Sequence, residues 1–190
     1  TREGKKTCSF EICEQLGWTV PDKVFVSVGD ANIISGLWKG FTDLLKLGLI
    51  DKLPQLIGVQ AEGSNAVAKA FDGDGIIRPV GGDTVADSIS VSVPRAGLAG
   101  VRALKETSGF PVVVSDAEIL AAIAELARET SVFAEPAGAA AYAGLKKAYE
   151  KKMLDEGETA VIVVTGNGLK DVASAMKAVG EPYLIEPDMA

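Results

Sequence analysis

Short runs of β-branched and other apolar residues alternate along the chain with longer helix-like segments, and this alternation limits the fold more than any other feature. The four runs are Val24–Val28, Leu56–Gln60, Val112–Val114 and Ala160–Val164. Strands that alternate with helical segments are typical of a parallel sheet covered on both faces. The sequence therefore predicts a three-layer α/β fold with an open, mostly parallel sheet.

The segments between these runs carry helix signals. Ser115 and Glu118 form an S-x-x-E capping box, which predicts a helix that starts at Asp116. Ser64 is the predicted N-cap of another helix, and the dense glycines of residues 72–83 predict a loop. The predicted helices are Lys5–Leu16, Ile34–Leu47, Asn65–Phe71, Leu98–Glu106, Asp116–Arg128 and Ala137–Lys151, with a short one at Thr84–Ser90.

The composition indicates how many domains the chain forms and which kind of molecule it binds. The chain has 190 residues, 47% of them hydrophobic, and no repeat or long linker, so residues 1–190 are predicted to form a single domain. A net charge of −7 disfavours a nucleic-acid or anionic-membrane surface. No apolar run approaches the roughly 20 residues of a membrane span. We therefore expect a cytoplasmic protein with a small-molecule partner.

The chain contains no histidine, which excludes several chemistries. Ser-His-Asp hydrolysis, Cys-His nucleophiles and HExxH metal sites all need an imidazole. Cys8 and Cys13 lie five residues apart on a predicted helix and point in different directions, so neither a metal site nor a disulfide is expected. Any catalysis has to use lysines, carboxylates, hydroxyls or a cofactor.

The turn Gly29–Ile33 follows a predicted strand and precedes a predicted helix. Such a turn places free backbone N–H groups and the positive end of a helix dipole at one point, where a phosphate group fits. Gly29 allows close approach or a positive φ, and Asp30 and Asn32 tolerate left-handed turn conformations. Taken alone, this stretch fits a plain strand-to-helix turn without a ligand at least as well.

Two further segments carry candidate residues. Thr165 stands at the carboxyl end of the last predicted strand, before a Gly-Asn-Gly turn, and ligands of open α/β sheets bind outside the carboxyl ends of strands. Glu135 precedes Pro136 at a predicted helix start, where a carboxylate is also favourable for the helix dipole alone. Neither a GxGxxG nor a GxxxxGK[ST] motif occurs, so nucleotide-binding motifs do not account for these turns.

Five segments together resemble one enzyme family. They are R-E-G-K-K-T (Arg2–Thr7), PDKVFVSVGDANI (Pro21–Ile33), GLIDKLPQLIGVQAEG (Gly48–Gly63), FAEPAGAAAYAGL (Phe133–Leu145) and VVTGNGLKD (Val163–Asp171). In this order they resemble threonine synthase, a family of the tryptophan-synthase-β-like, fold-type-II pyridoxal-phosphate enzymes. The resemblance spans nearly the whole chain.

The resemblance implies pyridoxal 5′-phosphate as cofactor and assigns roles to the candidate residues. Backbone amides of the turn Gly29, Asp30, Ala31, Asn32 and Ile33 are implied to hold the cofactor phosphate. Thr165 is implied to bond the pyridine nitrogen, and Glu135 is implied to lie near the cofactor. Family turns commonly read G-N-A-G-N or G-D-G-G-N, so this chain departs at Asn32, which replaces a glycine at a left-handed position, and at Ile33, which offers no side-chain amide.

The resemblance also implies what these 190 residues lack. Family members carry the Schiff-base lysine in an S-F-K-D-like segment ahead of the quoted motifs, and a Ser-Gly-Asn-Thr-like loop holds the substrate carboxylate; neither occurs here. Lys170 belongs to the TGNGLKD motif and is expected to be a surface or helix-start lysine. We therefore expect the chain to be the carboxyl-terminal, large-domain part of a longer enzyme, without catalytic residues of its own and inactive alone.

The implied reaction of the parent enzyme converts O-phospho-L-homoserine and water to L-threonine and phosphate, and a homodimer is a further expectation. Two alternatives stay open. One is a fragment of a serine/threonine dehydratase-like enzyme of the same fold, although its phosphate turn is usually a run of glycines. The other is a non-catalytic ligand-binding domain that kept the fold and lost the lysine.

Overall fold

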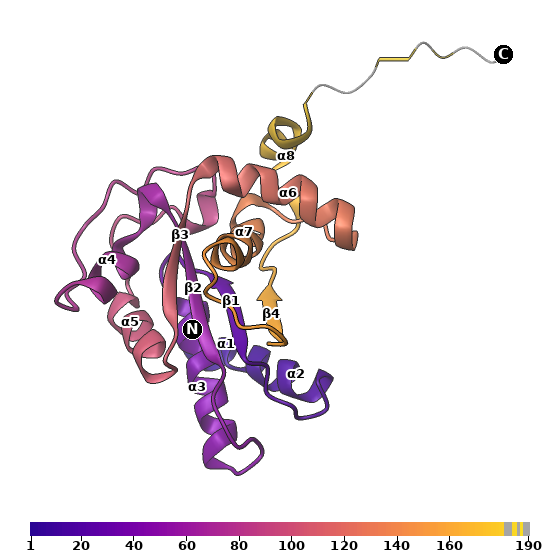
Figure 1. The fold of residues 1–190 in the computed structure, drawn as a ribbon. Coiled ribbons are helices and arrows are strands. Elements are labelled where there is room, and N and C mark those ends of the chain that lie inside the picture. The colour runs from indigo at the N-terminus through magenta and orange to yellow at the C-terminus, as the bar shows by residue number, and fades with distance from the viewer. Residues whose placement is uncertain (181–183, 186, 188–190) are drawn as a thin grey trace.

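A computed structural model of the protein describes residues 1–180, 184, 185 and 187, and its centre is a four-stranded parallel sheet (Figure 1). The strands are β1 (Lys23–Ser27), β2 (Gln55–Ala61), β3 (Phe110–Val114) and β4 (Ala160–Val163), in the order β3-β2-β1-β4. All three ladders are parallel. The predicted α/β class is confirmed, with a sheet that is parallel throughout the described strands.

Helices occupy each of the three connections between the strands, as predicted, and further helices precede β1 and follow β4. They are α1 (Arg2–Lys5), α2 (Thr7–Gln15), α3 (Asn32–Lys46), α4 (Ala66–Asp72), α5 (Gly97–Glu106), α6 (Asp116–Thr130), α7 (Pro136–Glu150) and α8 (Val172–Val179). Three single turns of 3₁₀ helix are η1 (Glu62–Ser64), η2 (Asp87–Ile89) and η3 (Gly168–Lys170). Within the described residues, none of the helices has the length and apolarity that crossing a bilayer requires.

The strand order explains why the helices form two layers. From β1 the chain moves in one direction to β2 and β3, and it then returns past β1 to add β4 on the other side. Right-handed crossovers place the helices of connections that run in opposite directions on opposite faces of the sheet. Accordingly, α3, α4 and α5 share a core with one face, whereas α6 and α7 share a core with the other (Figure 1).

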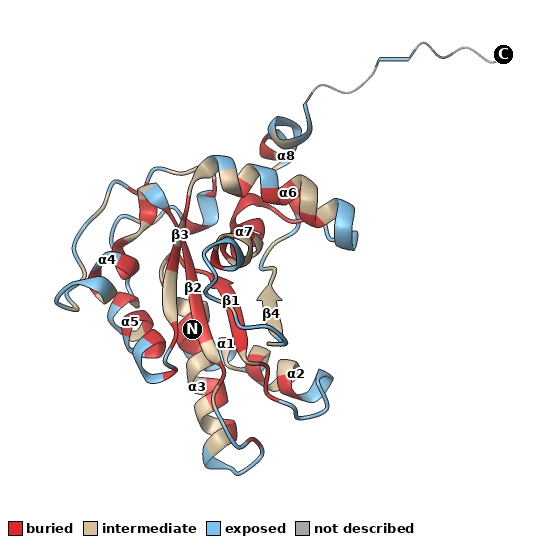
Figure 2. Cartoon of the chain, viewed as in Figure 1, coloured by how far each residue is buried: buried red, intermediate tan, exposed pale blue. Residues whose placement is uncertain are grey.

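Strand β1 is buried on both faces, which is why its three central residues, Val24–Val26, are all apolar (Figure 2). Successive side chains point to opposite faces, so Val24 and Val26 join the core beneath α3 and α5, and Phe25 joins the core beneath α6 and α7. At the edge of the sheet, β4 is only half-buried. The central position of β1 fixes the turn that follows it at the middle of the carboxyl edge of the sheet.

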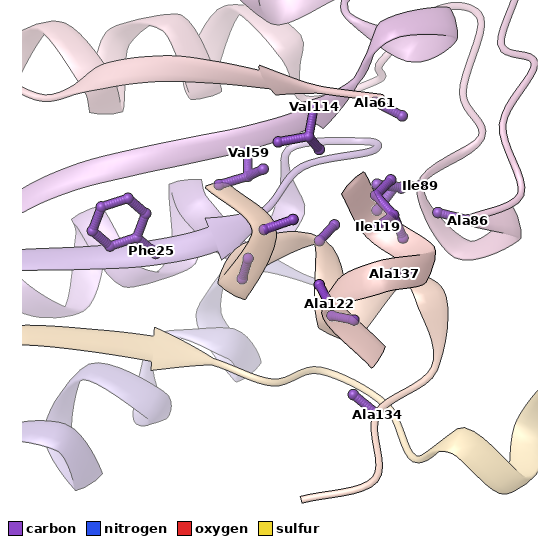
Figure 3. Packing of buried hydrophobic residues seen from close by; sticks show 14 of the residues in the cluster. Phe25, Val59, Ala61, Ala86, Ile89, Val114, Ile119, Ala122, Ala134 and Ala137 are labelled. Atoms are coloured by element: carbon purple, nitrogen blue, oxygen red, sulfur yellow. The ribbon is translucent and has the colours of Figure 1, made fainter. Parts of the chain in front are cut away.

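Helix α7 can pack closely against the sheet because the residues on its buried face are small. Alanine and glycine make up most of this face, and a Cβ added at Gly144 would lie 2.3 Å from a methyl carbon of Val59 on β2. Figure 3 shows Phe25, Val59 and Ala137 within the same buried cluster. The small residues thus let α7 cross the sheet and carry its first turn to the carboxyl edge.

Three details of the helix prediction were wrong. The helix predicted at Lys5–Leu16 is observed as α2 (Thr7–Gln15), and the separate helix α1 (Arg2–Lys5) ends where the predicted helix begins. Ser64 does not cap α4, because its hydroxyl donates to the carbonyl of Ile89 at 2.7 Å and Asn65 takes the N-cap position. The segment Thr84–Ser90 contains only the 3₁₀ turn η2, held by side chains such as Asp116, which accepts a hydrogen bond from the Val85 amide at 3.0 Å.

Candidate functional site

A pocket of about 280 Å³ lies at the carboxyl ends of β1 and β4. The chain leaves β1 towards one side of the sheet and reaches β4 on the other side, so the loops after these two strands diverge and leave a crevice between them. The pocket is lined by Lys5, Ser27, Gly29, Asp30, Ala31, Asn32, Ile33, Ser88, Ile89, Glu135, Ala137, Thr165 and Lys170. All seven residues predicted from the sequence as a binding site therefore line one pocket.

The turn Gly29–Ile33 presents free backbone donors to the pocket. None of the N–H groups of residues 29–33 donates a hydrogen bond to an acceptor in the part of the chain that the structure describes. Helix α3 begins at Asn32, so its positive dipole end lies at the same place. Unpaired N–H groups at a helix N-terminus are a binding site for a small anion.

The left-handed residue of this turn is Ala31, with φ of 62°, and the sequence-based assignment of that conformation to Asn32 was wrong. Asn32 is already the first helical residue. Gly29 is required for close approach, because a Cβ there would lie 2.9 Å from the Cα of Ile89. Its φ does not lie in the left-handed range. The turn is thus pressed against the segment that contains η2.

The carboxylate of Asp30 has a structural partner. Its Oδ1 accepts a hydrogen bond from the Arg95 amide at 2.9 Å, and its carbonyl oxygen accepts one from the Ala96 amide at 3.0 Å. These bonds join the turn to the start of α5. Asp30 also lines the pocket, and its backbone N–H remains available there.

Thr165 stands opposite the turn, on the loop that follows β4. Val163 of β4 pairs with Val26 of β1, so the residues just beyond each strand lie side by side. The hydroxyl oxygens of Ser27 and Thr165 are 3.5 Å apart. The structure therefore brings a hydroxyl at one wall of the pocket within reach of a ligand that also touches the turn.

Glu135 enters the pocket from the start of α7, and it is ion-paired. Its side chain is only 8% exposed, and its Oε2 lies 3.0 Å from the Nζ of Lys170. Ser88 accepts a hydrogen bond from the same Nζ at 2.5 Å and donates to Oε2 at 3.5 Å. Gly166 makes room for this arrangement, because a Cβ there would lie 2.0 Å from Oε1. A buried carboxylate needs such partners to remain favourable.

Six lining residues were not predicted as site residues: Lys5, Ser27, Ser88, Ile89, Ala137 and Lys170. Lys170 was expected to be a surface or helix-start lysine, and it does belong to η3. Its ammonium group also forms an ion pair with Glu135. Its place just after the Thr165 turn was a usable signal, since loops at the carboxyl ends of strands converge. Lys5 belongs to the R-E-G-K-K-T segment of the family resemblance, although no role was assigned to it, and nothing in the local sequence marked Ser88.

Fold and pocket together define a doubly wound parallel α/β protein. Its pocket lies at the topological switch point, where the chain leaves β1 in one direction and reaches β4 from the other, and this is where proteins of this class bind ligands. The family described as "Pyridoxal-phosphate dependent enzyme" matches residues 1–166. The chain belongs to this family, whose cofactor is pyridoxal 5′-phosphate.

Comparisons with individual proteins add detail. The chain is 42% identical over 189 residues to a threonine synthase of Methanocaldococcus jannaschii, and 43% identical over 175 residues to one of Mycobacterium tuberculosis. These matches cover 98% and 92% of this chain but 47% of each relative. The chain thus spans about half the length of the curated relatives it matches.

Two solved structures have the same fold. A processed threonine deaminase isoform from Solanum lycopersicum superposes with a TM-score of 0.77 at 24% identity, covering 94% of this chain and 48% of that one. A fungal L-serine ammonia-lyase from Rhizomucor miehei also gives 0.77, at 21% identity, covering 93% of this chain and 55% of that one. At these identities the likeness supports the fold alone.

Proposed function

We propose that this chain is the carboxyl-terminal, large-domain part of a threonine synthase and that its pocket holds pyridoxal 5′-phosphate. One observation carries the proposal: the turn Gly29–Ile33 and Thr165, 132 positions or more apart, line a single pocket at the switch point. The identity of 42–43% to threonine synthases over nearly the whole chain supports the particular reaction.

The residues of the pocket fit this cofactor. The phosphate group is held by the free N–H groups of Gly29, Asp30, Ala31, Asn32 and Ile33 and by the dipole of α3. Thr165 bonds the pyridine nitrogen through its hydroxyl, and Glu135 lies on the pocket wall with its charge offset by Lys170. The cofactor itself supplies an electron sink for carbanions. A neutral hydroxyl at the ring nitrogen makes that sink weaker than a carboxylate partner would.

The parent enzyme converts O-phospho-L-homoserine and water to L-threonine and phosphate, as a cytoplasmic lyase of threonine biosynthesis, and it forms a homodimer. The part represented here binds and orients the cofactor. Its 190 residues contain no S-F-K-D-like lysine segment, so we expect no turnover by this chain alone. Release of phosphate from O-phosphohomoserine by the purified 190-residue chain would contradict this expectation.

The dehydratase alternative has weaker support. The fold neighbours include a threonine deaminase, but the likeness to it is one of fold. The curated relatives with 38–43% identity carry the name threonine synthase. The turn itself, G-D-A-N-I, is not the run of glycines expected of a dehydratase.

The proposal is tested by titrating the purified chain with pyridoxal 5′-phosphate and following the absorbance of the cofactor. Saturable binding is expected, weakened by Gly29→Ala and by Thr165→Val. Thr19→Val serves as the matched control, because Thr19 is exposed and precedes the amino end of β1. Binding that responds equally to Thr165→Val and Thr19→Val, or that never saturates, would refute the proposed site.

A further inference from the structure

Two lysines line the pocket, and only one of them has a carboxylate partner. Lys170 pairs with Glu135. For Lys5, no carboxylate oxygen lies within 4.0 Å among the residues that the structure describes. Its neighbour Lys6 differs, because its Nζ lies 3.0 Å from Asp43 and 3.2 Å from Glu3. Lys5 is thus a half-buried ammonium group without a compensating charge.

The backbone of Lys5 is fixed beside the start of α3. Gly36, in the second turn of α3, makes this possible, because a Cβ there would lie 2.8 Å from the Cβ of Lys5 and 3.3 Å from the carbonyl oxygen of Arg2. Helix α1 therefore lies directly on α3, within one turn of the free N–H groups of the pocket. A lysine side chain that starts there and lines the pocket needs little rearrangement to meet an anion at those N–H groups.

The charges around the pocket show why such a cation is needed. Asp30 and Glu135 each contribute a negative charge to the lining, Lys170 is paired with Glu135, and Lys5, which makes no ion pair of its own in the described residues, brings the sum of the lining charges to zero. Without Lys5 the wall would be net negative, which disfavours a dianion. In addition, Ile33 offers no side-chain donor at the end of the turn. Backbone N–H groups alone would then have to hold the phosphate.

We infer that Lys5 is the side chain that forms a charge-assisted hydrogen bond with the phosphate group of the ligand. The inference rests on the proposed function and deepens it, since it assigns the phosphate to the lysine of the pocket that has no carboxylate partner among the described residues. Charge-assisted bonds of ammonium to phosphate oxygens are about twice as strong as neutral ones. Lys5 thereby shares the binding of the phosphate with the backbone amides of the turn.

The test uses pyridoxine 5′-phosphate, which has no aldehyde and forms no covalent bond with lysines, and calorimetric titration of the whole chain. Lys5→Met is expected to weaken binding by about tenfold or more. Lys6→Met is the matched control, with the same change in net charge one residue away, and it should alter binding by less than about twofold. Pyridoxine, which lacks the phosphate, should bind the native chain and Lys5→Met alike.

The outcomes separate this inference from the proposed function. If Gly29→Ala and Thr165→Val weaken binding but Lys5→Met does not, the pocket stands and the role of Lys5 is wrong. If Lys5→Met weakens pyridoxine as much as its phosphate ester, Lys5 has only a structural role and the inference also fails. If the native chain binds neither pyridoxine 5′-phosphate nor pyridoxine, both the proposed cofactor site and the role of Lys5 are wrong. Lys5→Gln, with the same readings, replaces Lys5→Met should circular dichroism show that the latter is unfolded.

Discussion

Gly144 allows α7 to lie against β2, and its replacement by alanine tests how the start of α7 is held at the pocket. The new Cβ would lie 2.3 Å from Cγ2 and 2.8 Å from Cγ1 of Val59. Both carbons belong to a side chain that is fully buried in the sheet. Neither can move without displacing its neighbours, so α7 has to lift away from β2. Because Glu135 is the N-cap of α7, this shift reaches the pocket.

The size of the effect follows from two opposing contributions. Overpacking a buried site costs about 1–3 kcal/mol, whereas alanine in a helix interior is favoured over glycine by about 1 kcal/mol. We therefore expect Gly144→Ala to lower the free energy of unfolding by between zero and about 2 kcal/mol. In a Val59→Ala background both methyl groups that clash are absent, so the same change should stabilise by about 1 kcal/mol.

The difference between the two backgrounds is a coupling free energy of about 1–3 kcal/mol, measurable by urea unfolding of the native chain, both single variants and the double variant. Gly4→Ala is the control, since a Cβ there meets nothing within 4 Å. Effects of Gly144→Ala and Val59→Ala that add within about 0.5 kcal/mol would refute the reasoning, because residues that do not touch are additive to that degree.

Three further predictions concern the helix start, the turn and the pH dependence. Ser115→Ala removes the hydroxyl that accepts from the Glu118 amide and should cost about 1 kcal/mol in urea unfolding. Ala31→Val puts a β-branched residue at a φ of 62° and should lower the free energy of unfolding by at least about 1 kcal/mol, and weaken pyridoxine 5′-phosphate binding as well. The hydrogen bond from Lys23 lowers the pKa of Glu158, a contribution to stability that is present above the ordinary glutamate value of about 4.3 and is lost as the pH falls below it. Lys23→Met should therefore flatten the acid branch of a plot of unfolding free energy against pH.

The order of strands and helices was predictable because each element carries its own local signal. The apolar run around Phe25 and the capping box at Ser115 specify a strand and a helix without reference to the rest of the chain. Where the conformation of a residue depends on a partner distant in the sequence, the local signal gave the wrong prediction. Ser64 has the chemistry of an N-cap, but its hydroxyl bonds to the carbonyl of Ile89, 25 positions away, and that partner cannot be found from the neighbouring sequence.

The candidate site also has features that local sequence signals predict and features that depend on distant contacts. Gly29 and Thr165 were predictable because each follows an apolar strand, and parallel strands end at one edge of the sheet. The conformation of the turn was not predictable, because its left-handed residue is Ala31, and alanine rarely adopts a positive φ. The pairing of Lys170 with Glu135 depends on how two loops meet in space, and no spacing in the sequence encodes it.

A net charge of −7 does not exclude the proposed binding of a phosphate dianion at this site. Charges separated by more than a Debye length, about 8 Å at physiological ionic strength, are largely screened, whereas contacts in a partly buried pocket are not. Within the pocket, Lys170 is paired with Glu135, so that in the proposed binding mode Lys5, the N–H groups of residues 29–33 and the dipole of α3 together face the phosphate. The net charge of the sequence therefore bears on extended polyanions, which contact many parts of a surface at once. It has little bearing on a small phosphate ester that contacts one pocket.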